Sequence, residues 1–192
     1  MRSSFLIFAG LCAAAAYAAP SHDDRAASAS ALLVGKFDNR QQVDKAAQNG
    51  DAPPHVVVTV EAVPVKNWSM WHVHLETDPQ TSYDQTWIVE TRIEHDGSVA
   101  LIPYYELRQE TPPTVAEFDQ SKWLSLEACA LRGSFRQAHV DGLSEGEPCV
   151  AASMSVGARR ALLPVGIVRE GDWLHLDFNL RGARTRIDAR RE

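Results

Sequence analysis

The sequence predicts a mostly β protein, an antiparallel β-barrel with an N-terminal helix and one short internal helix. Two observations point to the strands. From residue 55 onward, apolar and polar residues alternate with a period of two, as in half-buried antiparallel strands. These segments number roughly eight or nine, which is enough to close a barrel. An alanine-rich stretch at residues 26–34 indicates the N-terminal helix instead.

The first 18 residues have the pattern of a cleaved signal peptide. Arg2 precedes an apolar run, and Ala16-Tyr17-Ala18 is a small-residue cleavage motif. We therefore expect a periplasmic or secreted protein with no transmembrane segment in the mature chain, because no apolar run reaches the about 20 residues that a span needs. Cleavage leaves 192 − 18 = 174 residues and moves the net charge from −6 to −7, since Arg2 is lost. This acidity argues against nucleic acid as a partner.

Residues 19–30 lack any hydrophobic periodicity and predict a flexible tether that runs into the helix. Gly35 follows the helix, at a position where a left-handed residue commonly ends one. The barrel domain is then expected over residues 31–192.

The strands are expected in chain order with one hairpin and one helix between them. His95-Asp96-Gly97-Ser98 predicts a hairpin turn. Thr114 and Glu117 have the spacing of a capping box and predict the short internal helix. The expected strands are 55–61, 68–77, 87–94, 99–107, 128–137, 148–155, 160–169, 173–180 and 184–189.

Short motifs spread along the chain suggest a family. They are Gly35-x-Phe37-x-Asn39-x-x-Gln42 after the helix, a Glu ending the aromatic strand Trp71 to Glu76, Ser82-Tyr83, Leu126-Glu127-Ala128-Cys129, and Gly146-Glu147-Pro148-Cys149. Together they resemble the CpcT/CpeT family, the T-type phycobilin chromophore lyases, whose fold is a lipocalin-like (calycin) barrel. Two positions depart from the family pattern: Thr77 stands in place of a Gln, and Asp84 in place of an Arg.

The resemblance implies a small amphipathic ligand, similar to a bilin or another tetrapyrrole, bound by Asn39, Gln42, Glu76, Tyr83 and Asp177. Glu76 would be the catalytic acid/base of any lyase chemistry, since a carboxyl facing an apolar cavity has a raised pKa. With Tyr83 beside it, Glu76 is expected to meet the two carboxamides at one mouth of the barrel. The carboxamides suit either a ligand's lactam groups or the unpaired backbone at the barrel end.

A metal site is a second hypothesis. His72, His74 and Glu76 occupy alternate positions of one predicted strand, so their side chains share a face. Two imidazoles and a carboxylate suit zinc, iron or copper. His175 and Asp177 are the residues that would complete such a site from another strand. The alternatives are a polar wall facing a ligand and a plain solvated surface, because the sequence leaves open which face lines the barrel.

Cys129 and Cys149 are the cysteines that remain after cleavage of the signal peptide. Two cysteines in an oxidising compartment are expected to pair, and on the chain-entropy model the bond stabilises the fold by about 3 kcal/mol. A reactive thiol is the alternative.

Several enzyme classes are disfavoured by missing motifs. The chain has no phosphate loop and no glycine-rich dinucleotide turn. A ligand-binding barrel, with or without lyase chemistry, and a metal protein remain. A third hypothesis is a non-catalytic envelope protein that uses the barrel surface for a partner, and it is favoured if side chains fill the barrel.

Overall fold

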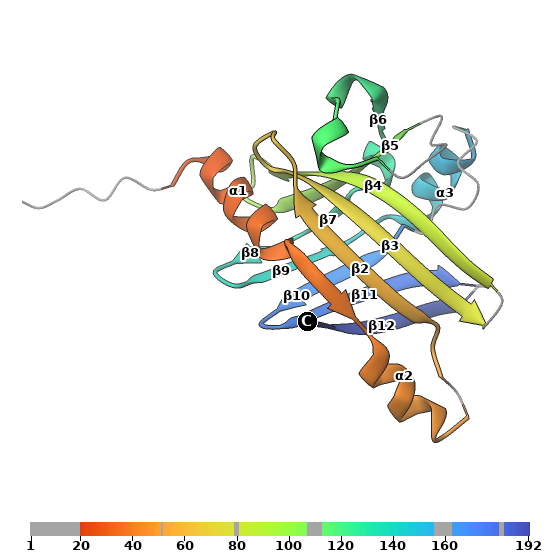
Figure 1. Cartoon of the computed structure of the whole chain (residues 1–192). Helices are drawn as coiled ribbons and strands as arrows, with labels where there is room; N and C mark the ends of the chain where they lie inside the picture. Colours follow the sequence, from red (N-terminus) through yellow and green to blue (C-terminus); the bar gives the residue numbers. More distant parts are fainter. Residues whose placement is uncertain (1–19, 51, 79–80, 107–112, 156–162, 181–182) are drawn as a thin grey trace, which may run out of the picture.

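The computed structural model describes residues 20–50, 52–78, 81–106, 113–155, 163–180 and 183–192 (Figure 1). The predicted signal peptide lies outside these residues. Among the described helices, none is both long enough and apolar enough to cross a membrane.

The described strands are β1 Gly35–Asp38, β2 His55–Ala62, β3 Trp68–Asp78, β4 Thr81–Ile93, β5 Val99–Glu106, β6 Trp123–Ser125, β7 Leu131–Gly133, β8 Phe135–Arg136, β9 His139–Leu143, β10 Gly166–Glu170, β11 Trp173–Leu180 and β12 Ala183–Arg191. Of these, β2, β3, β5, β11 and β12 begin and end close to the positions expected from the alternation. The helices are α1 His22–Leu33, α2 Arg40–Ala47 and α3 Gly146–Ser155, with the one-turn helices η1 Val115–Glu117, η2 Gln120–Lys122 and η3 Glu127–Cys129.

Within the described residues, 10 antiparallel strands form a closed barrel. The order around the barrel is β1-β2-β3-β4-β5-β7-β9-β10-β11-β12, and β12 pairs again with β1. The short strands β6 and β8 pair with β5 and β9 outside this ring. The mostly β, antiparallel barrel predicted from the sequence is therefore confirmed.

The core fills the inside of the barrel with the apolar half of each alternating strand. On β11, the buried side chains are Leu174, Leu176 and Phe178. On β3, Trp71 and its apolar neighbours two and four residues on point inward, while the polar set between them points outward. The structure thus shows which face of each strand lines the barrel, a point that the sequence left open.

The chain ahead of the barrel is helical from His22, so the flexible tether predicted at residues 19–30 is wrong over most of its length. The hydroxyl of Ser21 accepts a hydrogen bond from the Asp24 backbone N–H, and acidic side chains occupy the first turn. The small residues that hide any periodicity let Ala26 and Ala29 pack against the barrel, where both are buried.

Two elements near the N-terminus were not predicted. Gly35 follows α1 as expected, but it starts β1 with a φ of 150°, and a Cβ there would lie 2.8 Å from the Arg191 side chain. The helix α2 then projects from one end of the barrel (Figure 1). Because α2 buries none of its side chains, its sequence carries no core signal.

The predicted strand at 148–155 is wrong, because this segment belongs to α3. Pro148 is tolerated there since it lies in the first turn, where its missing N–H has no helical partner to lose. The expected strand at 128–137 is broken into η3, β7 and β8. The strand expected from residue 160 begins at Gly166, with residues 160–162 outside the described part.

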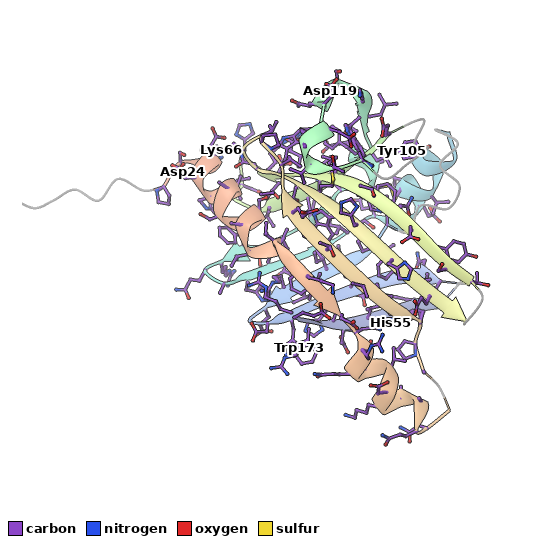
Figure 2. All side chains as sticks on the ribbon, in the orientation of Figure 1. Asp24, His55, Lys66, Tyr105, Asp119 and Trp173 are labelled. Atoms are coloured by element: carbon purple, nitrogen blue, oxygen red, sulfur yellow. A yellow bond between two sulfur atoms is a disulfide. The ribbon has the colours of Figure 1, made fainter. Side chains whose placement is uncertain are left out.

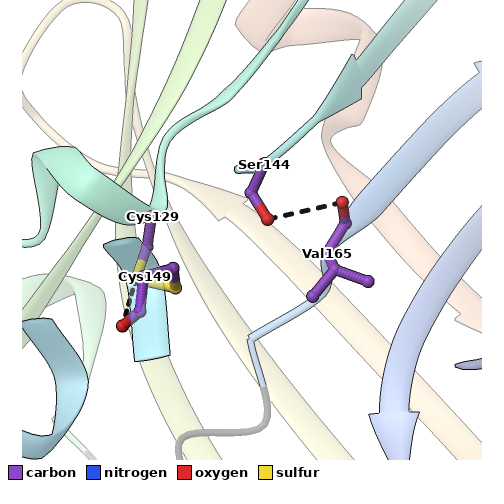
Figure 3. The surroundings of a disulfide bond; sticks show 4 residues. All are labelled: Cys129, Ser144, Cys149 and Val165. Carbon is purple, nitrogen blue, oxygen red and sulfur yellow. Dashed lines mark hydrogen bonds between the residues drawn. A yellow bond between two sulfur atoms is a disulfide. The ribbon is translucent and has the colours of Figure 1, made fainter. Parts of the chain in front are cut away.

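The structure contains the helix start, the hairpin turn and the disulfide that the sequence predicts. The carboxylate of Glu117 accepts the Thr114 backbone N–H at 3.1 Å, and short helices follow. The predicted hairpin turn closes with a hydrogen bond of 2.9 Å from the Glu94 N–H to the Ser98 carbonyl. Cys129 and Cys149 form the predicted disulfide, with 4.4 Å between their Cα atoms (Figure 3). It joins η3 to α3, and not two strands.

Candidate functional site

The barrel interior has little free space. Its cavity measures about 30 Å³, whereas pockets for drug-sized ligands typically measure about 300–1,000 Å³. A tetrapyrrole-like ligand therefore does not fit into this cavity. Among the described residues, the barrel is filled by side chains, which is the condition that favours a non-catalytic envelope protein using the barrel surface. The side chains around the cavity are apolar: Trp71, Val73, Trp87, Val89, Leu101, Pro103, Cys129, Leu131, Leu163, Pro164, Leu176 and Phe178.

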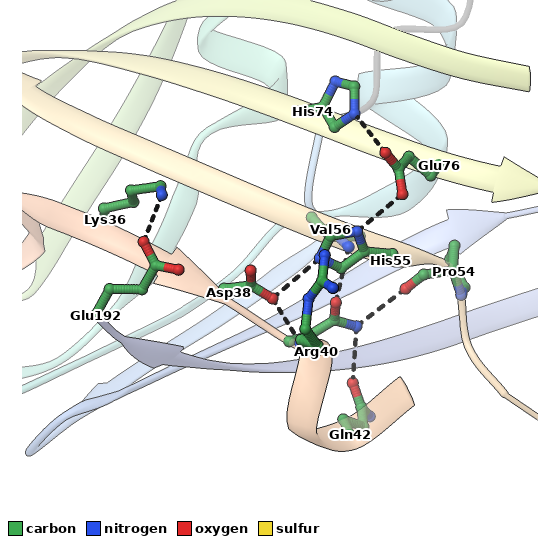
Figure 4. Close-up of polar contacts among 11 residues, drawn as sticks. Lys36, Asp38, Arg40, Gln42, Pro54, His55, Val56, His74, Glu76 and Glu192 are labelled. Carbon is green, nitrogen blue, oxygen red and sulfur yellow. Dashed lines mark hydrogen bonds and ion pairs between the residues drawn. The ribbon is translucent and has the colours of Figure 1, made fainter. Parts of the chain in front are cut away.

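Glu76 lies on the outer face of β3 with 48% of its side chain exposed. Its carboxylate contacts His55 Nδ1 at 2.9 Å and His74 Nε2 at 3.1 Å (Figure 4). The hydrogen bond from His55 is the main cause of a lowered pKa for Glu76, with His74 second. The expectation of a desolvated acid/base with a raised pKa is therefore wrong: Glu76 is an ionised surface carboxylate.

The same contacts extend across four strands as an alternating chain of carboxylates and imidazoles. Asp38 Oδ1 lies 3.0 Å from His55 Nε2, Glu76 stands between His55 and His74, and His74 Nδ1 lies 2.7 Å from Asp84 Oδ1. Hydrogen bonds to Asp84 and Glu76 raise the pKa of His74. We call these five residues, Asp38, His55, Glu76, His74 and Asp84, the imidazole–carboxylate chain. Within it, Asp84 is paired with His74.

The hypothesis of a metal site finds no support in the geometry. His72, His74 and Glu76 share the outer face of β3, as expected, but they do not converge. His72 Nδ1 contacts the Thr86 hydroxyl at 2.9 Å, and its Nε2 lies 3.5 Å from Glu61. In the described part of the chain, no group of three or more His, Cys, Asp or Glu side chains is arranged to hold a metal ion.

Asn39 and Gln42 close the backbone at the end of the barrel from which α2 projects. Asn39 is fully buried, and its Oδ1 accepts the Val56 N–H at 2.7 Å while its Nδ2 donates to the Pro54 carbonyl and to Gln42 Oε1. Gln42 Oε1 also accepts the Asp188 N–H at 3.0 Å. Of the two roles proposed for the carboxamides, these bonds match the structural one.

The remaining predicted ligand residues lie apart. Tyr83 pairs with Leu75 across β3 and β4 and is 51% exposed. Asp177 accepts a hydrogen bond of 2.6 Å from Arg184 on the outer face of β11. Neither contacts the carboxamides or Glu76 among the described interactions, so the expected cluster is reduced to Asn39 and Gln42, with Glu76 linked to the same barrel end through His55 (Figure 4).

A larger recess lies between α2 and the outer face of β11 and β12. Its volume is about 640 Å³, inside the range typical of ligand pockets. The helix side contributes polar and small residues, and the sheet side contributes an aromatic, an imidazole and a carboxylate. We call it the α2 groove, and its lining residues are Gln41, Gln42, Lys45, Ala46, Asn49, Trp173, His175 and Asp188.

The sheet side of the α2 groove is ordered by contacts between its own side chains. Trp173 stands outside the barrel wall on the side where α2 projects (Figure 2), and 37% of it is exposed. The His175 ring lies nearly parallel to the indole, at an angle of 12° and a centroid distance of 6.1 Å. His175 Nδ1 contacts Asp188 Oδ1 at 2.6 Å. A carboxylate can only accept, so His175 Nδ1 donates the proton of this hydrogen bond.

Sequence reasoning named parts of the α2 groove without seeing that they form one site. Gln42 was a predicted ligand residue, and His175 was a residue expected to complete a metal site. Lys45 and Asn49 were missed because α2 was not predicted. One signal was available: the run 40–47 contains neither Gly nor Pro and follows an asparagine, a favoured residue at helix starts.

We compared the chain with family models, curated proteins and solved structures, and none of them matches it. The likeness to the CpcT/CpeT family therefore rests on the short motifs and on the antiparallel barrel. Of these, the structure supports the 10-stranded barrel alone.

Proposed function

We propose that this protein is an exported, non-catalytic β-barrel that holds a small amphipathic ligand in the α2 groove. One observation carries the proposal: the groove offers about 640 Å³ and the barrel interior about 30 Å³. The ligand class is the one that the CpcT/CpeT resemblance implies, and the site moves from the inside of the barrel to its outer wall. The signal-peptide pattern and the disulfide support export, since disulfides persist outside the cytoplasm.

The lining of the α2 groove suits a molecule with apolar and polar parts. Trp173 and Ala46 offer apolar surface, while Gln41 and Asn49 are exposed carboxamides that both donate and accept hydrogen bonds. His175 adds an imidazole whose orientation is fixed by Asp188. Six of the eight lining residues are polar or charged, so the groove offers mostly hydrogen-bonding groups around one aromatic side chain.

Lyase chemistry is not part of the proposal. The residue expected to transfer protons, Glu76, is half exposed and has a lowered pKa, so it stays ionised at neutral pH and has no proton to donate. It also lies on β3 and contacts histidines outside the α2 groove lining.

Absorbance spectroscopy tests the proposal with two tetrapyrroles, biliverdin and haemin. The expected result is a saturable difference spectrum at micromolar ligand that Trp173→Ala abolishes. Asn179→Ala is the matched control, because Asn179 is exposed on the same face of β11 and does not line the groove. A flat difference spectrum with both ligands rejects a tetrapyrrole, and binding that survives Trp173→Ala unchanged rejects the groove as its site.

A further inference from the structure

We infer that the ligand of the α2 groove is an anion, with a carboxylate, a sulfonate or a similar acidic group attached to an apolar body. The inference rests on the proposed function and adds the charge of the ligand to it. Its basis is a pair of cations at the groove, Lys45 among the lining residues and Arg190 beside the lining Trp173. Lys45 lines the groove from α2, and the Arg190 guanidinium lies 5.9 Å from the centre of the Trp173 indole.

Neither cation has a carboxylate partner in the part of the chain that the structure describes. The lysine and arginine ion pairs found there use other cations, namely Lys36, Lys66, Arg92, Arg132, Arg184 and Arg186. The chain has a net charge of −6, with carboxylates in excess. Two cations left unpaired around one recess of an acidic protein create a local positive potential there, which attracts anions.

The one carboxylate that lines the α2 groove is occupied. Asp188 Oδ1 contacts His175 Nδ1 at 2.6 Å and accepts from Arg186 Nε at 3.2 Å, and Oδ2 lies 3.5 Å from Gln42 Nε2. Since Arg186 offsets its charge, Asp188 does not cancel Lys45 and Arg190. Two further acids, Asp44 and Asp172, are chain neighbours of the groove residues; like Arg190 they are not lining residues, and among the described ion pairs neither is paired with Lys45 or Arg190.

The arrangement of Arg190 and Trp173 explains why the ligand also needs an apolar body. The guanidinium lies over the indole face, so an acidic group paired with Arg190 brings the atoms attached to it against the indole. Lys45, on α2, is then available to the acidic group or to a second one. A free inorganic anion could pair with the two cations, but it has no apolar part that could contact the Trp173 indole.

A pair of fluorescent probes tests the inference. Anilinonaphthalene sulfonate is an aromatic anion, and N-phenylnaphthylamine has the same skeleton without the sulfonate. Titrations followed by fluorescence are expected to give a dissociation constant about tenfold lower for the sulfonate, as one charge-assisted contact contributes. Raising the salt concentration from about 0.02 M to about 0.5 M should weaken the sulfonate alone, because salt screens exposed charges.

Charge-removing variants locate the effect. Lys45→Gln and Arg190→Gln should each weaken the sulfonate several-fold and leave the neutral probe unchanged, and Arg190→Lys should restore part of the loss. Lys66→Gln is the matched control: Lys66 is exposed and pairs with Asp24 of α1, outside the groove lining. It should leave both probes unchanged.

The outcomes separate the inference from the proposed function. Equal affinity for both probes, with no effect of salt or of the two charge variants, overturns the anionic ligand while leaving the groove as a site. Absence of binding by either probe, or binding of both that Trp173→Ala does not weaken, overturns the proposed function and the inference with it.

Discussion

The barrel interior and the α2 groove use the two faces of the same strand in opposite ways. On β11, Leu174 and Leu176 point inward and are almost completely buried, while Trp173 and His175 point outward into the groove. The inner face contributes packing and the outer face contributes hydrogen-bonding groups and charge. In this 10-stranded barrel, apolar side chains fill the interior, and the larger recess lies on the outer wall.

The largest expected effect is a difference in stability between variants of two tryptophans, Trp87 and Trp173. Trp87 is 2% exposed inside the barrel, so Trp87→Ala should lower the free energy of unfolding by about 3–5 kcal/mol. Trp173→Ala should cost about 1 kcal/mol or less, because the side chain is partly exposed, and should abolish ligand binding. Urea unfolding and probe titration measure both quantities. Comparable losses of stability in the two variants would contradict the placement of Trp87 in the packed core and of Trp173 on the outer wall.

Loss of the disulfide should have the next largest effect on stability, because the disulfide is part of the barrel interior and not of the α2 groove. Cys129 lines the cavity and Cys149 joins it from α3, 20 residues along the chain. Replacing both with serine should lower stability by about 3 kcal/mol on the loop-entropy model, without changing groove affinity. Mass measurement should show a gain of two hydrogens on reduction. Two thiols that react with an alkylating reagent before reduction would contradict the pairing.

Asn39 connects the two regions, so its loss should affect both. Asn39→Ala removes the acceptor of the buried Val56 N–H and should lower the free energy of unfolding by about 1–3 kcal/mol. It also frees Gln42, which holds α2 on β12, and should therefore weaken probe binding. Gln41→Ala is the control, since Gln41 is exposed in the groove and should change affinity without changing stability. Normal probe affinity in Asn39→Ala would mean that α2 holds its place by other contacts.

The smallest effect is expected from pH, and it sharpens the comparison because the titrating groups lie on the outer wall. The pKa of His74 is raised above 6.5, so its stabilising contribution is complete below about pH 6.5 and is lost as the pH rises through the raised pKa. The pKa of Glu76 is lowered below 4.5, so its contribution is present above about pH 4.5 and is lost as the pH falls through the lowered pKa. The imidazole–carboxylate chain should therefore stabilise most between these limits.

Stability measured from pH 3 to pH 8 tests this window. Glu76→Gln should flatten the profile, whereas Glu145→Gln, an exposed control ahead of α3, should leave it unchanged. An unchanged profile in Glu76→Gln would mean that these exposed contacts contribute nothing measurable.

The fold was predictable wherever a signal is local. Alternation gave β2, β3, β4, β5, β11 and β12, and turn and capping residues gave the hairpin at Gly97 and the helical turn after Thr114. The failures have physical reasons. The helix α2 buries no side chain and so shows no apolar stripe. The strand expected at 148–155 is part of the helix α3, where Pro148 lies in the first turn and the disulfide ties the segment to η3.

The candidate site was less predictable than the fold. The sequence predicted one polar face with His74 and Glu76 and another with His175 and Asp177, and it predicted the pairing of Cys129 with Cys149. Only the tertiary structure decided which face of each strand meets water, because a period of two is identical for a strand viewed from either side. It also decided the α2 groove itself, since Gln42 meets Asp188 across 146 positions of the chain, and no local pattern encodes a contact made by closing the barrel.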